Sequence, residues 1–243
     1  SYSTTGWTKS NVVVTANCSD SQSGIVSSKV TKTVSSNGSG SLTCTDKAGN
    51  TKAVSYNVAN IDKTMPSASI SYSTTGWTKN NVVITANCSD SQSEIVSSKV
   101  TKTVSSNGSG SLTCTDKAGN TKAVSYNVAN IDKVIPNNFT LSPNSGFIGN
   151  KDNITIPKPG DTGGSGFYRF RYRISVNGSS SSYGSWSGYY TNATNITIST
   201  IGTYYIQVEA FDKAGNVRTV RSGQYSVFDS TSGSLYYLLR RRR

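Results

Sequence analysis

Residues able to carry acid–base or nucleophilic chemistry are few in this chain. Its 243 residues include 12 acidic residues and no histidine. Without histidine there is no Ser-His-Asp or Cys-His nucleophile system, no HExxH zinc site and no imidazole general base. A hydrolase that uses carboxylates alone would need two acids across one cleft, within about 10 Å of each other. The sequence indicates no such pair, so we expect no catalytic residues, no cofactor and no enzyme activity.

Calcium is the metal that recurring aspartates would suit, since it takes six or more oxygen ligands. Three aspartates recur in two copies of a repeat: Asp20, Asp46 and Asp62, then Asp90, Asp116 and Asp132. Each is isolated in the sequence, and Asp46 lies in a turn, where capping of backbone N–H groups accounts for an aspartate without a metal. We therefore expect no metal site.

Cysteines occur in two pairs: Cys18 with Cys44, and Cys88 with Cys114. Two cysteines without histidine fall short of four zinc ligands, and no CxxC pair points to redox catalysis. The members of a pair fall in strands that lie in opposite sheets of an immunoglobulin sandwich, so a disulfide is one interpretation and a pair of reduced, buried thiols is the other. A disulfide would stabilise a domain of this size by about 3 to 4 kcal/mol.

Basic and aromatic side chains of the last third of the chain are candidates for ligand binding. In a strand over Phe167–Ile174, one face would carry Arg169, Arg171 and Arg173, whose guanidinium groups suit phosphate or carboxylate polymers. A solvated outer face is the alternative. The aromatic candidates, which could stack on sugars, follow among Ser and Gly: Trp186, Tyr189 and Tyr190. Core packing is the alternative for these rings.

The elements that position these residues are short strands. Residues 1–66 and 71–136 are nearly identical, with a period of 70 residues. Within a copy, Asn11–Cys18 alternates in period two and places Val12, Val14, Ala16 and Cys18 on one face. Turn signals follow each run, including a Lys-Ala-Gly-Asn turn in which Gly49 takes the left-handed conformation. This pattern predicts an all-β chain of tandem immunoglobulin-like antiparallel β-sandwiches without helices.

Domain boundaries follow from two short linkers, Ile61–Pro66 and Ile131–Pro136, in which proline favours extended, stiff backbone. A third Asp-Lys-Ala-Gly-Asn motif at Asp212–Asn216 indicates that a divergent third module follows the two repeats. The sequence predicts four regions: repeat 1 over residues 1–62 with a truncated first strand, repeat 2 over 63–133, a divergent domain over 134–229, and a basic, disordered tail over 230–243.

Several motifs resemble the bacterial immunoglobulin-like (Big-type) tandem domains of Gram-positive surface proteins. In the first repeat these are Gly6–Thr8, Cys18–Ile25, Ser41–Thr51 and Asn60–Lys63, and in the third module Gly202–Arg218. The resemblance implies an extracellular or cell-surface location and a non-catalytic stalk or adhesion segment that spaces or presents other modules. Cell-wall polymer, glycan or a host surface would be the partners, and the chain would be monomeric.

Two alternatives to the stalk remain open: an adhesin that binds carbohydrate or anionic polymer through the third domain, and an accessory region of a cell-wall-degrading enzyme. The net charge of +12 is spread over all regions, whereas nucleic-acid binders concentrate basic residues in one stripe, so we expect no nucleic-acid partner. The apolar run Leu235–Leu239 before four arginines is far shorter than the roughly 20 residues of a membrane span, and we expect no span.

Overall fold

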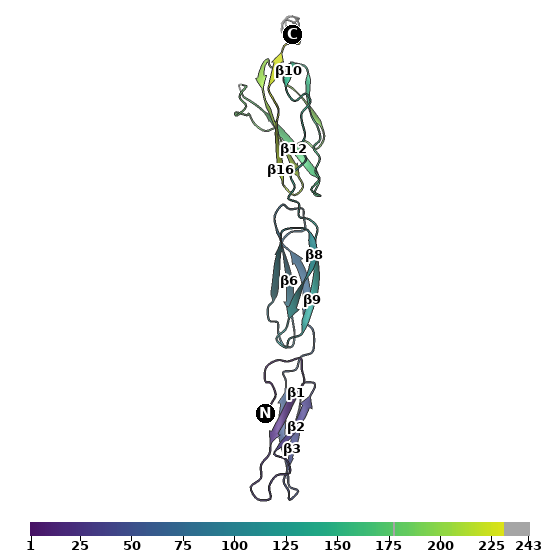
Figure 1. Ribbon diagram of the computed structural model, residues 1–243, viewed down its shortest axis with the longest axis vertical. Coiled ribbons are helices and arrows are strands. Elements are labelled where there is room, and N and C mark those ends of the chain that lie inside the picture. The colour runs from purple at the N-terminus through teal and green to yellow at the C-terminus, as the bar shows by residue number, and fades with distance from the viewer. Residues whose placement is uncertain (177, 231–243) are drawn as a thin grey trace. The chain divides into compact units, whose positions relative to one another are not determined.

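The computed structural model describes residues 1–176 and 178–230 (Figure 1). Within these ranges the regular secondary structure consists of β-strands alone, which confirms the all-β fold class. All strand pairs are antiparallel except one pair in the third module. None of the described residues forms a helix that is long and apolar enough to cross a membrane. The predicted tail after Ser230 lies outside the described residues.

The chain divides into two compact units. The first unit holds residues 1–73, 82–104 and 108–128; the second holds 74–81, 105–107 and the described residues from 129 on. All strands of the two repeats belong to the first unit, and the strands of the third module belong to the second. The four regions expected from the sequence stay a prediction.

In the first repeat two hairpins face each other across one core. The strands are β1 (Val12–Asn17), β2 (Lys29–Val34), β3 (Gly38–Thr45) and β4 (Thr51–Val58). β1 pairs with β2 and β3 pairs with β4. The predicted inward face of β1 is buried as a whole and packs with Leu42, Tyr56 and Val58. Alternating apolar residues therefore position both layers, although Val54 of the last strand is 39% exposed.

The second repeat repeats this plan with one more strand. Its strands are β5 (Ser67–Tyr72), β6 (Val82–Ser89), β7 (Lys99–Val104), β8 (Gly108–Thr115) and β9 (Thr121–Val128). One sheet has the order β5-β6-β7 and the other is the β8-β9 hairpin. β5 thus covers the edge of β6 that corresponds to the outer edge of β1.

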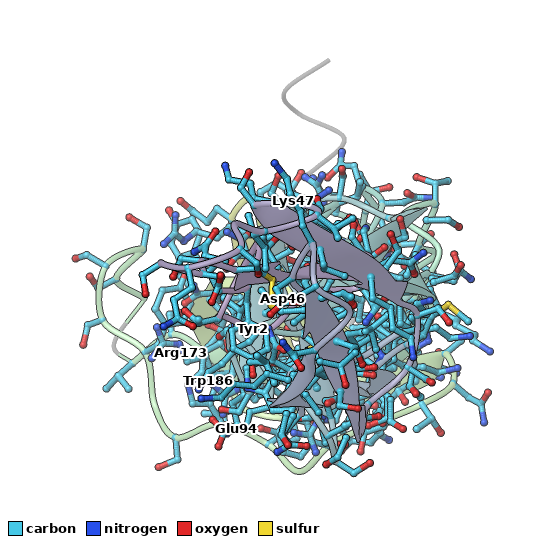
Figure 2. All side chains as sticks on the ribbon, turned by 90° about the horizontal axis from the view of Figure 1, so that it is seen from below. Tyr2, Asp46, Lys47, Glu94, Arg173 and Trp186 are labelled. Atoms are coloured by element: carbon cyan, nitrogen blue, oxygen red, sulfur yellow. A yellow bond between two sulfur atoms is a disulfide. The ribbon has the colours of Figure 1, made fainter. Side chains whose placement is uncertain are left out.

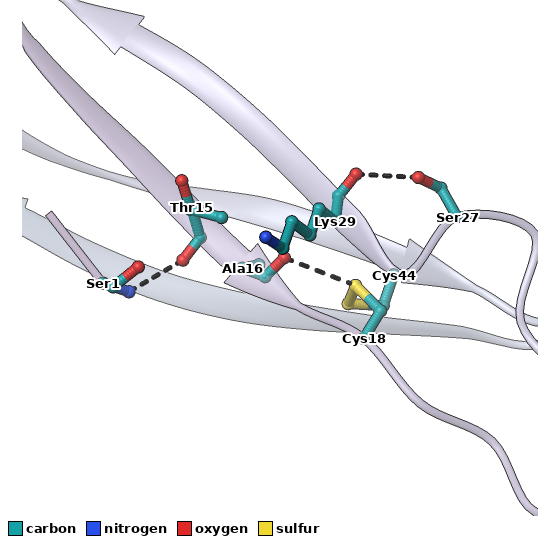
Figure 3. The surroundings of a disulfide bond; sticks show 7 residues. All are labelled: Ser1, Thr15, Ala16, Cys18, Ser27, Lys29 and Cys44. Atoms are coloured by element: carbon teal, nitrogen blue, oxygen red, sulfur yellow. Dashed lines mark hydrogen bonds between the residues drawn. A yellow bond between two sulfur atoms is a disulfide. The ribbon is translucent and has the colours of Figure 1, made fainter. Parts of the chain in front are cut away.

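A disulfide joins the two sheets of each repeat. Cys18 is bonded to Cys44 and Cys88 to Cys114, with Cα–Cα distances of 5.7 and 5.6 Å, and no free cysteine remains among the described residues. Figure 3 shows Cys18 at the end of β1, where its Sγ also lies 3.9 Å from the carbonyl oxygen of Ala16. Of the two interpretations of the cysteines, the disulfide is confirmed.

The described residues of the third module form eight strands: β10 (Gly146–Gly149), β11 (Asn153–Ile156), β12 (Phe167–Ile174), β13 (Thr194–Thr197), β14 (Gly202–Tyr204), β15 (Ile206–Asp212), β16 (Val217–Arg221) and β17 (Tyr225–Phe228). The sheets have the orders β12-β15-β16, β10-β17-β14 and β11-β13. Phe170, Val208 and Tyr225 are fully buried in the core that these sheets share. Large apolar side chains fill this core in a module that has no cysteine.

Candidate functional site

The Asp-Lys-Ala-Gly-Asn hairpin has the same geometry in all three modules. In each copy the backbone N–H of the Asn donates to Oδ1 of the Asp four residues earlier, at 2.8 Å. The glycines take positive φ angles of 93°, 89° and 87° at Gly49, Gly119 and Gly215, which glycine adopts without steric cost. The predicted turn is confirmed, and it fixes one carboxylate and one amide at the end of each module.

The linker aspartate between the repeats is tied to that hairpin. Asp62 is 1% exposed. Its Oδ1 accepts the Thr64 N–H at 2.8 Å and its Oδ2 accepts the Ser93 N–H at 3.2 Å. The side-chain amide of Asn120 donates both to the Asp62 carbonyl oxygen, at 2.9 Å, and to Oδ2 of Asp116, at 2.8 Å. Asn120 therefore bridges the linker and the hairpin of the second repeat.

Three carboxylates meet at this point. Asp62, Asp90 and Asp116 each place one carboxylate oxygen within 4.8 Å of the other two. Asp62 and Asp116 are both 1% exposed. We call these three residues, all of which belong to the first unit, the first aspartate triad.

The second unit contains a matching triad, built by Asp132, Asp161 and Asp212 within the same 4.8 Å. Oδ2 of Asp132 accepts the Ser165 N–H at 2.9 Å. The Asn216 amide donates to the Asp132 carbonyl oxygen at 2.9 Å and to Asp212 Oδ2 at 2.7 Å. This second aspartate triad thus repeats the bonding of the first, although the loop that supplies Asp161 differs in sequence from the loop that supplies Asp90.

The linker carboxylates are held in the ionised form. Burial raises the pKa of Asp62, but hydrogen bonds from Ser93 and Thr64 outweigh burial and leave the pKa below its ordinary value. The pKa of Asp132 is likewise lowered: burial opposes the shift, and hydrogen bonds from Ser165 and Val134 produce it. The pairs of opposite charge in the described part of the chain do not involve either triad. Within the described residues, no lysine or arginine therefore forms an ion pair with a triad carboxylate.

The donor set of a triad fits a hard divalent cation. Three carboxylates supply only oxygen, which Ca²⁺ prefers, and backbone carbonyls and water commonly complete its six to eight ligands. Each oxygen that already accepts an N–H bond keeps a second lone pair for a cation. A bound cation would remove the repulsion among charges packed within 4.8 Å. The fold thus brings together aspartates that are isolated in the sequence, including four of the six recurring ones.

One signal in the sequence points to the triads. An Asp in the linker and an Asp-Asn pair in the following hairpin occur at both junctions, at Asp62 and Asp132 and then at Asp116–Asn120 and Asp212–Asn216. The third member comes from a loop between strands, and no spacing rule connects that loop to the linker.

The predicted arginine row lies on β12 as an interleaved stack. The guanidinium carbon of Arg169 lies 3.7 Å from the ring centroid of Tyr189. Those of Arg171 and Arg173 each lie 4.4 Å from the Trp186 ring. Figure 2 shows Arg173 beside Trp186. The stack thus unites five of the six predicted ligand-binding residues.

Two of the three guanidinium groups bond polar side chains of the module, whereas the buried Nε of Arg169 has no hydrogen-bond partner. Arg171 forms an ion pair of 2.8 Å with Glu209, and Arg173 Nε donates to the Gln207 side chain at 2.9 Å. The sixth predicted residue, Tyr190, instead stacks on Phe170 at a centroid distance of 5.5 Å, against the core. That any of these residues binds a ligand stays a prediction.

No protein-family model and no curated protein matches this chain. Among solved structures, one that is similar is described as the tetra-tandem repeat in the extending region of a large adhesion protein. The match has 15% sequence identity, covers 91% of this chain and 68% of that chain, and has a TM-score of 0.25.

Proposed function

We propose that the chain is a non-catalytic, extracellular spacer segment of a surface stalk, in which an aspartate junction ties each linker to the hairpin that follows it. The observation that supports this most is that the same junction is built twice. At both, a buried linker Asp, an Asn bridge and a lysine contact recur: Lys9 Nζ donates to the Gly119 carbonyl at 2.8 Å and Lys79 Nζ to the Gly215 carbonyl at 3.0 Å. Repeated, hydrogen-bonded junctions suit a spacer segment, because they limit the motion of each linker.

Burial of the triads argues against hydrolysis by paired carboxylates. A glycosidase needs its two acids open to the substrate. Asp62, Asp116 and Asp212 are each 1% exposed, so no polymer chain can reach them. The histidine-free composition removes the other common general base.

We propose further that each triad binds one Ca²⁺ ion. The support is the oxygen-only donor set, the absence of a basic partner among the described ion pairs, and the recurrence of the set in two loops of different sequence. In this role the cation stiffens the junction, because it ties the linker, the hairpin and a loop of the next module together.

The arginine stack favours a spacer over a ligand-binding module. Guanidinium groups that bind a polymer offer both donors of their fork to the ligand. In Arg171 two donors are taken by Glu209, with Nε and Nη2 at 3.0 and 2.8 Å from the same carboxylate oxygen. Arg171, at the middle of the row, thus uses its charge inside the module.

Small-angle X-ray scattering of the full chain tests the spacer. A compact globule of this length would have a radius of gyration of about 18 Å. A spacer keeps its ends apart, so we expect a value well above that, independent of protein concentration. A radius near 18 Å would refute the proposed function.

A further inference from the structure

Strand β15 of the third module is paired on both sides, whereas its counterparts in the two repeats are paired on one side. β3, β8 and β15 each lead into an Asp-Lys-Ala-Gly-Asn hairpin. β15 lies between β12 and β16, but β8 pairs only with β9, and β3 only with β4. No described strand of either repeat therefore occupies the place that β12 takes in the third module.

The unpaired edge of β8 presents a row of backbone hydrogen-bonding groups. The N–H of Val96 donates to the Thr115 carbonyl oxygen at 3.0 Å, so the backbone groups of Thr115 point away from β9. Because this direction alternates along an antiparallel strand, the same edge carries the N–H and C=O groups of Ser109, Ser111 and Thr113. Beyond the bond at Thr115, no described backbone group pairs with this edge.

The first repeat has the same edge on β3. There the N–H of Val26 donates to the Thr45 carbonyl oxygen at 3.0 Å, and the outward row consists of Ser39, Ser41 and Thr43. We call each of these two rows an open edge.

The third module shows how a strand occupies this place. β12 runs antiparallel to β15, with Arg171 opposite Glu209. Counted back from the hairpin aspartate, Glu209 corresponds to Thr113 of β8. An extended segment that runs antiparallel to β8 can therefore pair with the open edge as β12 pairs with β15.

The open edges lack the features that protect a sheet edge against strand addition. Natural edge strands carry charged side chains, proline or bulges. β3 and β8 both read Gly-Ser-Gly-Ser-Leu-Thr-Cys-Thr, with neither a charge nor a proline. The neighbouring edge strand β7, in contrast, carries Lys99 and Lys102. Strand addition is thus favoured at β3 and β8.

Lysine sets the chemistry of the segment that fits. The charged residues on the strands of the two repeats are all lysines, and none takes part in an ion pair between described residues. Lys102 Nζ lies 5.7 Å from the ring centroid of Tyr126. The hydroxyl of that ring lies over Gly110 of β8, since a Cβ added at Gly110 would lie 2.5 Å from it. Lys102 therefore holds positive charge beside the open edge.

We infer that β3 and β8 each accept an extended, acidic peptide segment of a partner protein as an added antiparallel strand. Strand addition supplies main-chain hydrogen bonds to the open edge. A carboxylate opposite Gly110 pairs with Lys102, or with Lys32 at the equivalent place in the first repeat. The inference goes beyond the spacer function, because a spacer needs no partner along its strands.

The probe is the peptide Thr-Val-Thr-Asp-Thr-Val-Thr, blocked at both ends and titrated into the full ¹⁵N-labelled chain. It keeps the alternation of Val100–Val104 in β7 and has Asp where β7 has its central lysine. We expect saturable shifts at Ser109, Ser111 and Thr113 and at their counterparts in the first repeat. The amide of Glu209, which β12 covers, should not shift.

Two N-methylated peptides of the same charge are the matched controls. Each carries methyl groups on one of the two alternating sets of backbone nitrogens. One set faces the open edge, so that peptide should bind at least tenfold more weakly, while the other should bind as the unmodified peptide does. Equal binding of the two would mean attraction by charge alone and would overturn the inference.

The role of lysine is tested in the same titration. Lys102→Gln should weaken binding of the peptide to the second repeat about two- to fivefold, as expected for an exposed ion pair. Lys151→Gln, at an exposed position of the third module, should leave binding unchanged. An equal effect of the two variants would overturn the acidic character of the partner.

A second measurement covers an affinity too low to titrate. Val96 is 66% exposed beside the open edge, and Val96→Cys allows the peptide to be attached there through a flexible Gly-Ser tether, which raises its local concentration. The amides of Ser111 and Thr113 should then exchange with deuterium at least tenfold more slowly, whereas Leu112, whose N–H faces β9, should not change. Unchanged exchange at Ser111 would overturn the inference.

Two other outcomes are separated by the same data. Association of the chain that depends on its concentration, with protection of Ser111 in the absence of peptide, would show that a second copy occupies the edge and would overturn the inference. The scattering measurement uses the chain without peptide, so failure of this inference is distinguishable from failure of the spacer.

Discussion

At the scale of single residues, Asn120 is buried in the second repeat, whereas its counterpart Asn50 in the first repeat is exposed. Its side chain bonds Asp62 and Asp116 in a buried site, and its removal leaves Asp116 short of a donor. We expect Asn120→Ala to lower the free energy of unfolding by about 1 to 3 kcal/mol. The matched variant Asn50→Ala, at an exposed position, should cost about 0.5 kcal/mol. Urea unfolding of both variants checks this, and equal losses would show that the bridge contributes nothing.

The lowered pKa of Asp62 predicts how stability depends on pH. A carboxyl whose folded pKa lies below its unfolded value of about 3.9 stabilises the fold fully above that value. This stabilisation is lost as pH falls through the folded pKa. In EDTA, we expect the free energy of unfolding of the chain to fall as pH drops below about 4, and Asp62→Asn to make this fall shallower. Urea titrations at several pH values measure the slope of the unfolding free energy against pH. If Asp62→Asn has the same slope as the unaltered chain, hydrogen bonds to Asp62 do not lower its pKa.

Residue types and their spacing predicted the turns, and they left the cysteines open between a disulfide and a pair of reduced thiols. Gly49 takes the predicted left-handed conformation, which follows from local chemistry, whereas the bond between Cys18 and Cys44 depends on how the two sheets face each other. The triads did not follow, because Asp90 reaches Asp62 only through the packing of a loop on a linker.

At the scale of elements, period-two alternation predicted the strands well. Val12, Val14 and Ala16 are buried as a β-sheet face, because apolar alternation has one solution in a two-layer sandwich. Period-two alternation did not predict which strands face each other across the two layers. The arginines of β12 were placed on one face correctly, but their partner Trp186 comes from a loop, so the stack could not be predicted.

The disulfides make a prediction about the sheets. Each closes a loop with a sequence separation of 26 residues, for which loop-closure entropy gives about 3.5 kcal/mol. We expect the double variant Cys88→Ala/Cys114→Ala to lower the free energy of unfolding of the second repeat by about 3 to 4 kcal/mol. This repeat should therefore unfold at a lower urea concentration. Hydrogen exchange resolved by repeat measures this loss. A loss spread equally over the first repeat and the third module would contradict the assignment of the bond to one sandwich.

At the scale of the whole molecule, calcium should bind at two places. Isothermal titration of the full chain, freed of metal with EDTA, should show two sites, one for each triad. Asp116→Asn should remove one site and Asp212→Asn the other. Asp46→Asn, the counterpart in the hairpin without a linker, should leave both. Absence of binding at millimolar calcium, or an equal effect of all three variants, would refute the cation while leaving the hydrogen-bonded junction in place.

The central claim is that a junction holds successive repeats in one arrangement. Spin labels at Thr31→Cys and Thr101→Cys, equivalent exposed positions of β2 and β7, test it by pulsed electron spin resonance within the first unit. A pair inside one repeat, Thr31→Cys with Ser55→Cys, gives the width expected from label motion alone.

With calcium present we predict a single distance between residues 31 and 101, as narrow as in the control pair. The distribution should broaden in Asp62→Asn. A broad distribution in the chain with an intact junction would contradict the account.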